Sequence, residues 1–228
     1  MKKILIIDCG ETLDPVKSEF GHCVQWISDI VVNTCECKIS VNEVYKGEKF
    51  VESQIDGVII TGSADSVYNE LPWMLYLQRK ILEYDSKNVP ILGICFGHQL
   101  IVKTFGGQVE KNSKGWEIGS SEVYLTDKGR KSELFNGIPD KFIVYESHQD
   151  TATFISDRMI VLAENILGNQ AVICNDTTYG IQFHPEFSRE ISQAYLNGRR
   201  SLDPEIIYKN VESSIYGHEV LKNYIKLL

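Results

Sequence analysis

The sequence predicts an α/β domain built around a largely parallel sheet. Its apolar runs are short and alternate with stretches of helical periodicity, as in chains whose parallel strands are joined by helices. Two of the runs, 57–60 and 89–94, pass directly into segments of small residues and end at Thr61 and Cys95. The composition agrees, because 43% hydrophobic and 24% charged residues in a chain of 228 are typical of a globular protein.

The first half of the chain is expected to alternate strands with helices. The apolar runs predict strands at 3–8, 57–60 and 89–94. Helical spacing predicts helices at 18–32, at 72–84, and from just after Cys95 to Gly106-Gly107.

In the second half the periodicity changes toward two, which favours strands joined by turns. The expected strands are 120–125, 142–145, 159–164, 170–174 and 179–183, and one or two helices are expected at 204–228. Without a repeat or a low-complexity linker, we expect one domain over 1–228. Its core would span about 1–187, with a helical C-terminal extension at about 188–228.

Charge and hydropathy argue against two classes of partner. The formal charge is −8, and no run of Lys and Arg is dense enough to follow a phosphate backbone, so no nucleic-acid partner is expected. The apolar run after Lys3 ends at Asp8, which indicates a buried strand rather than an export signal, and no segment has the length of a membrane span. We therefore expect a cytoplasmic protein with reduced thiols.

The six cysteines show no spacing typical of a metal site. Cys35 and Cys37 are separated by one residue, which fits neither a zinc knuckle nor a redox motif. Cys9, His22 and Cys23 share the N-terminal region, but no further ligand is spaced to complete a set. Neither a metal nor a cofactor is expected.

The segment with the clearest chemistry is Gly93-Ile94-Cys95-Phe96-Gly97, where a predicted strand meets a predicted helix. This pattern is that of a nucleophile elbow, in which small neighbours permit a strained turn at the nucleophile. The following helix directs its N-terminal N–H groups toward the sulfur, and the N–H of Phe96 is placed to stabilise an oxyanion. A buried structural cysteine flanked by incidental glycines is the alternative interpretation.

A thiol nucleophile needs a base, and His184 has the best setting among the five histidines. It follows a predicted strand in Gln182-Phe183-His184-Pro185-Glu186, where residues two apart project to the same side. Glu186 is therefore placed to accept a hydrogen bond from the imidazole and to select its tautomer. By itself, a His-Pro-Glu tripeptide is also typical of a surface turn.

Together, Gly93-Ile94-Cys95-Phe96-Gly97-His98-Gln99 and Gln182-Phe183-His184-Pro185-Glu186 resemble the motifs of class I glutamine amidotransferases. The resemblance runs from the first strand to about Phe187. It implies a flavodoxin-like fold and a catalytic triad of Cys95, His184 and Glu186. By that resemblance Cys95 attacks the glutamine amide, His184 transfers the proton to the departing ammonia, and water releases glutamate from a γ-glutamyl thioester.

The resemblance also assigns residues around the triad. The segment Thr61-Gly62-Ser63-Ala64 stands in place of the family's Gly-Gly-Pro oxyanion loop, so the backbone of Gly62 or Ser63 would complement that of Phe96. Substrate contacts are implied for Gln99, Ser147, His148 and Gln149, with Gln149 where related amidotransferase domains have Gly.

Three neighbouring residues are given other roles. On a helix His98 would point away from Cys95, which indicates packing, and His148 is expected in a loop rather than as a second base. Trp116, next to Glu117, is expected either to line a pocket or to lie under a surface loop.

The substrate is a small molecule, either glutamine or a γ-glutamyl compound, and several roles remain open. The chain has no Ser-Gly-Gly-x-Asp-Ser or G-x-x-x-x-G-K-[ST] phosphate loop, which favours a glutaminase that serves an ammonia-accepting synthase subunit, or else a stand-alone γ-glutamyl peptidase. A PfpI-like cysteine hydrolase and a non-catalytic scaffold of the same fold are further alternatives.

Overall fold

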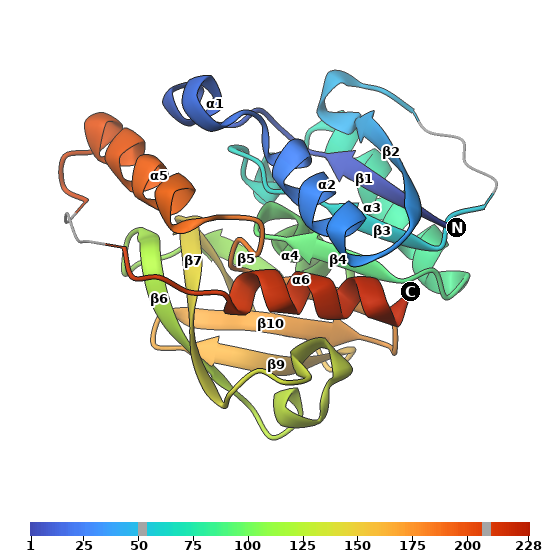
Figure 1. Ribbon diagram of the computed structural model, residues 1–228. Coiled ribbons are helices and arrows are strands. Elements are labelled where there is room, and N and C mark those ends of the chain that lie inside the picture. The colour runs from blue at the N-terminus through green and yellow to red at the C-terminus, as the bar shows by residue number, and fades with distance from the viewer. Residues whose placement is uncertain (50–53, 207–210) are drawn as a thin grey trace.

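A computed structural model describes residues 1–49, 54–206 and 211–228, and shows helices on both faces of a long sheet (Figure 1). Among these residues nine strands form the sheet, in the order β2-β1-β3-β4-β11-β10-β9-β6-β7. The first five in that order run parallel: β2 (Cys37–Glu43), β1 (Lys2–Asp8), β3 (Gly57–Ile60), β4 (Ile91–Ile94) and β11 (Thr178–Ile181). The predicted α/β fold with a flavodoxin-like parallel core is confirmed.

The other end of the sheet is antiparallel. It consists of β10 (Gly168–Cys174), β9 (Met159–Asn165), β6 (Glu117–Leu125) and β7 (Lys141–His148). A separate antiparallel ribbon is formed by β5 (Gln108–Lys111) and β8 (Asp150–Phe154). Antiparallel neighbours need only short turns, so no crossover helix is required here.

Helices bury both faces of the parallel half. In Figure 1, α2 (Cys23–Thr34) and α6 (Tyr216–Leu227) lie in front of the sheet, and α3 (Pro72–Ser86) and α4 (Phe96–Thr104) lie behind it. Beyond the edge, α1 (Asp14–Phe20) packs against α5 (Arg189–Leu202). Four short 3₁₀ segments complete the described structure: Val44–Lys46, Val67–Asn69, Gly129–Lys131 and Glu133–Phe135.

Two predicted helices are wrong in their extent. The helix expected at 18–32 is broken at Gly21, whose φ of 83° ends α1 after Phe20 before α2 begins at Cys23. The helix expected from 204 covers only α6, and residues 207–210 of that range lie outside the described residues. The preceding α5 lies within the helical extension expected at about 188–228, and Ser188 caps it by accepting a hydrogen bond from the N–H of Ile191.

Three strands were not predicted, and each contributes few buried side chains. β2 is an edge strand in which Asn42 is the single fully buried residue, and both β5 and β8 belong to the small ribbon. Edge and ribbon strands bury too little surface to impose a clear alternation on the sequence.

Helix α6 is tied to the centre of the sheet by Tyr224. Its side chain is fully buried, and its hydroxyl donates to the carbonyl oxygens of Val58 at 2.8 Å and Pro90 at 2.9 Å. These carbonyls belong to β3 and to the residue before β4, so the C-terminal helix stabilises the two strands that lead to the loops at 61–64 and 95.

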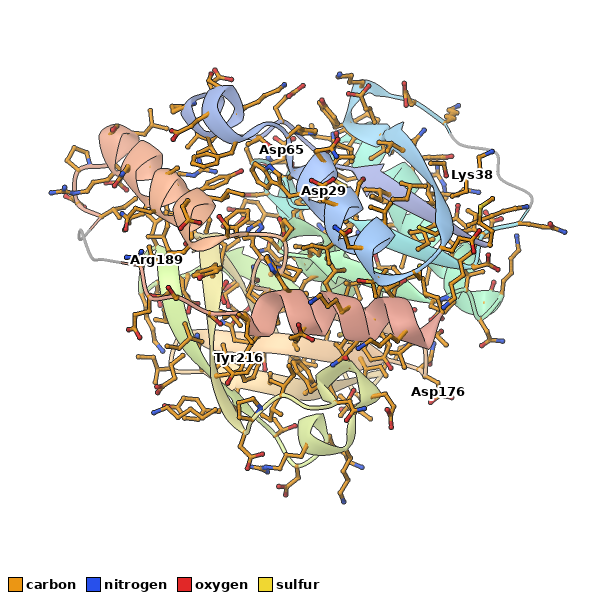
Figure 2. The ribbon with its side chains drawn as sticks, viewed as in Figure 1. Asp29, Lys38, Asp65, Asp176, Arg189 and Tyr216 are labelled. Atoms are coloured by element: carbon orange, nitrogen blue, oxygen red, sulfur yellow. The ribbon has the colours of Figure 1, made fainter. Side chains whose placement is uncertain are left out.

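Replacing Tyr224 by Phe is expected to lower the free energy of unfolding by about 1–3 kcal/mol, because the hydroxyl is lost from a buried position. The measurement is urea unfolding followed by circular dichroism. Tyr216→Phe is the matched control on the same helix, since Tyr216 lies at its N-terminal end (Figure 2) and makes an aromatic contact with Phe142. Equal effects of the two substitutions would contradict this role for the Tyr224 hydroxyl.

Candidate active site

The nucleophile elbow is formed where β4 ends at Ile94 and α4 begins at Phe96. Between them Cys95 has φ 50° and ψ −102°, a conformation that non-glycine residues rarely adopt. A Cβ at Gly93 would lie 2.5 Å from the carbonyl oxygen of Gly97, and one at Gly97 would lie 2.6 Å from that of Ile60. Both glycines are therefore required for the close approach of strand and helix around the cysteine.

His184 reaches the elbow because its strand is the parallel neighbour of β4. In this register Ile181 pairs with Ile94, and the N–H of Cys95 donates to the carbonyl of Ile181 at 2.9 Å. The chain then continues three residues to His184, whose N–H donates to the carbonyl of Tyr145 at 2.8 Å. Two residues almost ninety positions apart in sequence thus meet at one edge of the sheet.

The imidazole of His184 is held on several sides. Its Nδ1 lies 2.8 Å from Oε1 of Glu186, and the side chain of Cys95 is close enough to raise the pKa of the ring. The ring stacks on Phe187, with centroids 4.1 Å apart and planes 13° apart. A hydrogen bond to Glu186 and a stacking surface together fix the orientation of the ring toward the sulfur.

Charge neighbours decide the protonation of His184. Burial alone would lower its pKa, but the carboxylate of Glu186 and the side chain of Cys95 raise the pKa to about 10. The imidazole is therefore protonated at neutral pH.

The loop after β3 closes the other side of this pair. A Cβ on Gly62 would lie 3.2 Å from Cε1 of His184 and 3.7 Å from Cβ of Cys95, so this glycine backbone lies directly against both. The loop is anchored where the hydroxyl of Thr61 accepts a hydrogen bond from the N–H of Cys9 at 2.9 Å. Ser63 lines the same cavity as Cys95, and Phe96 is the first residue of the helix that follows it.

Two cavities meet at Cys95, and we refer to them together as the cleft. The smaller, of about 40 Å³, extends past His184 and Glu186 toward the loop after β1 and is bounded by Tyr195. The larger, of about 270 Å³, extends over Gln99 and Trp116. The residues common to both are Ser63, Ala64, Cys95, Ser147 and Arg199.

The predicted substrate-binding residues lie around the larger cavity. Ser147 borders both cavities, and its buried hydroxyl has no hydrogen-bond partner among the described residues. Gln149 lines the cavity between β7 and β8. The side-chain amide of Gln99 donates to the carbonyl of Asp150 at 3.1 Å and to Gln182 at 3.2 Å, so it also holds the loop that follows Ser147.

The carboxylate of Asp150 joins two loops of the cleft. It accepts hydrogen bonds from the hydroxyl of Ser66 at 2.6 Å and from that of Tyr68 at 3.1 Å. The segment after β3 and the segment after β7 are therefore fixed relative to each other on the side of the larger cavity.

The expectation that His148 lies in a loop is wrong. It is the last residue of β7 and is buried beneath the cleft, with Nδ1 2.8 Å from the carbonyl oxygen of Asp150. Its Nε2 lies 3.2 Å from Glu117 and 3.2 Å from Glu146. Pairing with Ile118 and Glu117 of β6 continues the strand through Ser147 and His148, where a loop was expected.

The buried cluster of Glu117, Glu146 and His148 was not found from the sequence. The signal for it was Glu146, an acidic residue directly after the apolar run 142–145. Burial opposes charge on His148, but the two carboxylates raise its pKa well above the ordinary value. Burial raises the pKa of Glu146 to about 7, helped by the charge of Glu117. For Glu117 burial acts against ionisation, yet His148 and Asn165 bring its pKa below the usual value.

The remaining candidates have structural partners. His98 is buried against Gly180 of β11, and burial lowers its pKa to about 3, in agreement with the predicted packing role. His22 and Cys23 lie near Asp8, and both ring nitrogens of His22 are occupied, Nε2 by Asp8 at 2.8 Å and Nδ1 by Thr12 at 2.9 Å. These contacts hold the loop after β1 against α2.

Comparison with known proteins agrees with this fold. Residues 18–198 match the family model described as glutamine amidotransferase class-I. A glutamine-hydrolyzing GMP synthase of Borreliella burgdorferi is 37% identical over 185 residues, which cover 73% of this chain and 34% of that protein. The chain therefore spans about a third of the length of that relative.

Other relatives are similar over their whole length. One subunit of the glutamine-hydrolyzing GMP synthase of Methanopyrus kandleri is 30% identical over 98% of this chain and 97% of that protein. The crystal structure of a glutamine amidotransferase from Thermotoga maritima covers 99% of the chain with a TM-score of 0.77 at 22% identity, which shows a common fold. The chain belongs to the class I glutamine amidotransferase family.

Within the described ranges, none of the helices combines the length and hydropathy that crossing a lipid bilayer requires.

Replacing Glu146 by Gln is expected to stabilise the fold more at pH 8 than at pH 5. The pKa of Glu146 is about 7 when folded, above its ordinary 4.5, so the unfolded chain loses this proton first and the buried acid destabilises the fold as the pH rises between these values. The expected difference between the two pH values is about 2–3 kcal/mol. Urea unfolding at each pH measures it.

The control for this experiment is Glu110→Gln, an exposed glutamate on β5. It should change stability little at either pH. A stabilisation by Glu146→Gln that is equal at pH 5 and pH 8 would show that burial does not perturb this carboxyl.

Proposed function

We propose that this protein hydrolyses the side-chain amide of glutamine, with Cys95 as nucleophile, His184 as acid and base, and Glu186 as the residue that orients His184. The observation that carries the proposal is the pairing of His184 with both Glu186 and Cys95 at a strained strand-to-helix turn. Membership of the class I glutamine amidotransferase family supports the same chemistry.

In the proposed reaction the Cys95 thiolate attacks the amide carbon, forming a C–S bond and placing negative charge on the amide oxygen. Backbone N–H groups of Phe96 and of Gly62 or Ser63 would stabilise that oxygen. The His184 imidazolium gives its proton to the amide nitrogen, the C–N bond breaks, and ammonia leaves a γ-glutamyl thioester. Water then attacks while His184 accepts its proton, and glutamate departs as the thiolate is regenerated.

The two cavities at Cys95 differ in size. The one beside His184 and Glu186 measures about 40 Å³ and the other about 270 Å³. The larger cavity has more room for the glutamyl group, so we take it as the substrate side of the cleft.

We further propose that the ammonia is used by a separate synthase subunit. The similarity to a protein named as one subunit of GMP synthase, over 97% of its length, supports this role. The alternative is a stand-alone γ-glutamyl peptidase, which Gln149 favours because it changes the loop at which related domains have glycine. Comparing ammonia release from glutamine with cleavage of γ-glutamyl dipeptides separates the two.

Cys95→Ala is expected to reduce glutamine hydrolysis by at least about 10⁴-fold while the far-ultraviolet circular dichroism spectrum stays unchanged. Ammonia release under saturating glutamine is the measurement. Cys35→Ala is the matched control, because Cys35 is a free cysteine at the end of α2, outside the cleft. Ordinary activity in Cys95→Ala would exclude the proposed mechanism, and an inactive wild type would favour a non-catalytic scaffold.

Glu186→Gln is expected to lower kcat about 10²-fold and to move the basic limb of the pH profile to lower pH. The Glu186 carboxylate is one of the groups that raise the pKa of His184, so removing its charge allows the imidazolium to lose its proton earlier as the pH rises. The pH dependence of kcat/KM between pH 6 and 10 checks this.

Glu190→Gln, at an exposed position in the first turn of α5, is the control for charge alone. Its profile should match that of the wild type. An unshifted basic limb in Glu186→Gln would mean that Glu186 does not act on His184.

A further inference from the structure

The cleft contains an arginine that the triad does not use. Arg199 lines both cavities that meet at Cys95, and it comes from α5. Tyr195, one helical turn earlier on the same face, also borders the smaller cavity. This face of α5 therefore forms a wall of the cleft opposite the elbow.

The helix that carries Arg199 is fixed in place. Ile191, Tyr195 and Leu196 are buried, and the N-terminus is capped by Ser188. Gly198, immediately before Arg199, packs so closely that an added Cβ would lie 2.7 Å from the side chain of Leu13. The guanidinium is thus presented to the cleft by a rigid element.

The side chain of Arg199 is oriented but not neutralised. Its guanidinium carbon lies 5.1 Å from the ring centre of Trp116, a cation–π contact that restrains the position of the group. Its Nε is buried, and no hydrogen-bond or ion-pair partner for the guanidinium occurs among residues 1–49, 54–206 and 211–228. A planar guanidinium held in this way presents a fork that matches a carboxylate.

The other charged side chains of the larger cavity indicate where a substrate carboxylate would bind. Besides Arg199, the basic residues of the lining are Lys111 and His148, and His148 is already paired with Glu117 and Glu146. The acids are Asp65 and Asp150, with Asp150 already bonded to Ser66 and Tyr68. A carboxylate placed near the acids would be repelled. Arg199, which also borders Cys95, is the favourable partner.

We propose that Arg199, oriented by Trp116, binds the α-carboxylate of the γ-glutamyl substrate and makes the cleft selective for substrates in which that group is free. This inference rests on the proposed function, because it assumes that the glutamyl group occupies the larger cavity. Arg199 is then a residue that binds substrate and takes no part in the proton transfers of His184.

Arg199→Gln tests this binding role. With L-glutamine it is expected to raise KM about 10- to 100-fold, because a charge-assisted hydrogen-bonded pair is lost, and to change kcat less than about threefold. Arg199→Lys keeps the charge but loses the fork, so it should raise KM by a smaller factor. Arg200→Gln is the matched control, an exposed neighbour on the same helix that lines neither cavity.

Two further substrates identify the carboxylate. Glutamine α-amide lacks the α-carboxylate. The wild type should therefore have a high KM for this compound, and Arg199→Gln should not raise that KM further. γ-Glutamylglycine keeps the α-carboxylate and has a second carboxylate on its leaving group. In Arg199→Gln its KM should rise by the same factor as the KM for glutamine. A rise confined to γ-glutamylglycine would place Arg199 on the leaving-group side and overturn the proposal.

The result separates this inference from the proposed function. If wild type hydrolyses glutamine through Cys95 but KM is unchanged in both Arg199→Gln and Arg199→Lys, the role of Arg199 is wrong and the proposed function stands. A fall in kcat and thermal stability with constant KM would show a structural role and would equally overturn it. If wild type releases no ammonia, the proposed function itself fails.

Discussion

The structure of the cleft depends on the parallel pairing of β11 with β4. In that register Ile181 lies beside Ile94, and the N–H of Cys95 donates a hydrogen bond to the carbonyl of Ile181. The chain that leaves β11 therefore reaches Cys95 within three residues. A slip of one residue would send His184 to the other face of the sheet, because side chains alternate along a strand. Both strands are completely buried, which is why the apolar packing of the sheet can specify the register so strictly.

Two histidines of the cleft, His184 and His148, are each placed next to acidic side chains. At the surface of the cleft His184 lies between the acidic side chain of Glu186 and the sulfur, and these neighbours outweigh the effect of burial on its pKa. Beneath it His148 is paired with Glu117 and Glu146, which lie on the two antiparallel strands that support Ser147. Buried charges destabilise a fold unless they are paired. The pairing here fixes the ends of β6 and β7, and with them the floor of the larger cavity.

The C-terminal segment contributes to the cleft as well as to stability. The hydroxyl of Tyr224 on α6 donates hydrogen bonds to the carbonyls of Val58 and Pro90. Gly217 of the same helix lies against the backbone of Pro185, the residue between His184 and Glu186. In contrast, α5 lies beyond the sheet (Figure 1) and supplies Tyr195 and Arg199 to the cavities. A division of the chain into a core of about 1–187 and an extension stays a prediction, but the side chains of the extension complete both the packing and the cleft.

The sequence by itself determined the buried parallel strands and the elbow, because each depends on consecutive residues. The approach of His184 to the elbow was expected from the order of the two motifs along the chain, and it depends on the pairing of β11 with β4. Apolar runs specify buried strands, Gly93 and Gly97 specify the tight turn, and parallel strands bring their carboxyl ends to one edge. The catalytic roles of Cys95, His184 and Glu186 stay predictions that the geometry supports. Only the tertiary structure decided the buried position of His148 with Glu117 and Glu146 and the placement of Arg199 on Trp116. These features arise from contacts between elements far apart in sequence, and the distance between such side chains is set by packing, which no local pattern of residues encodes.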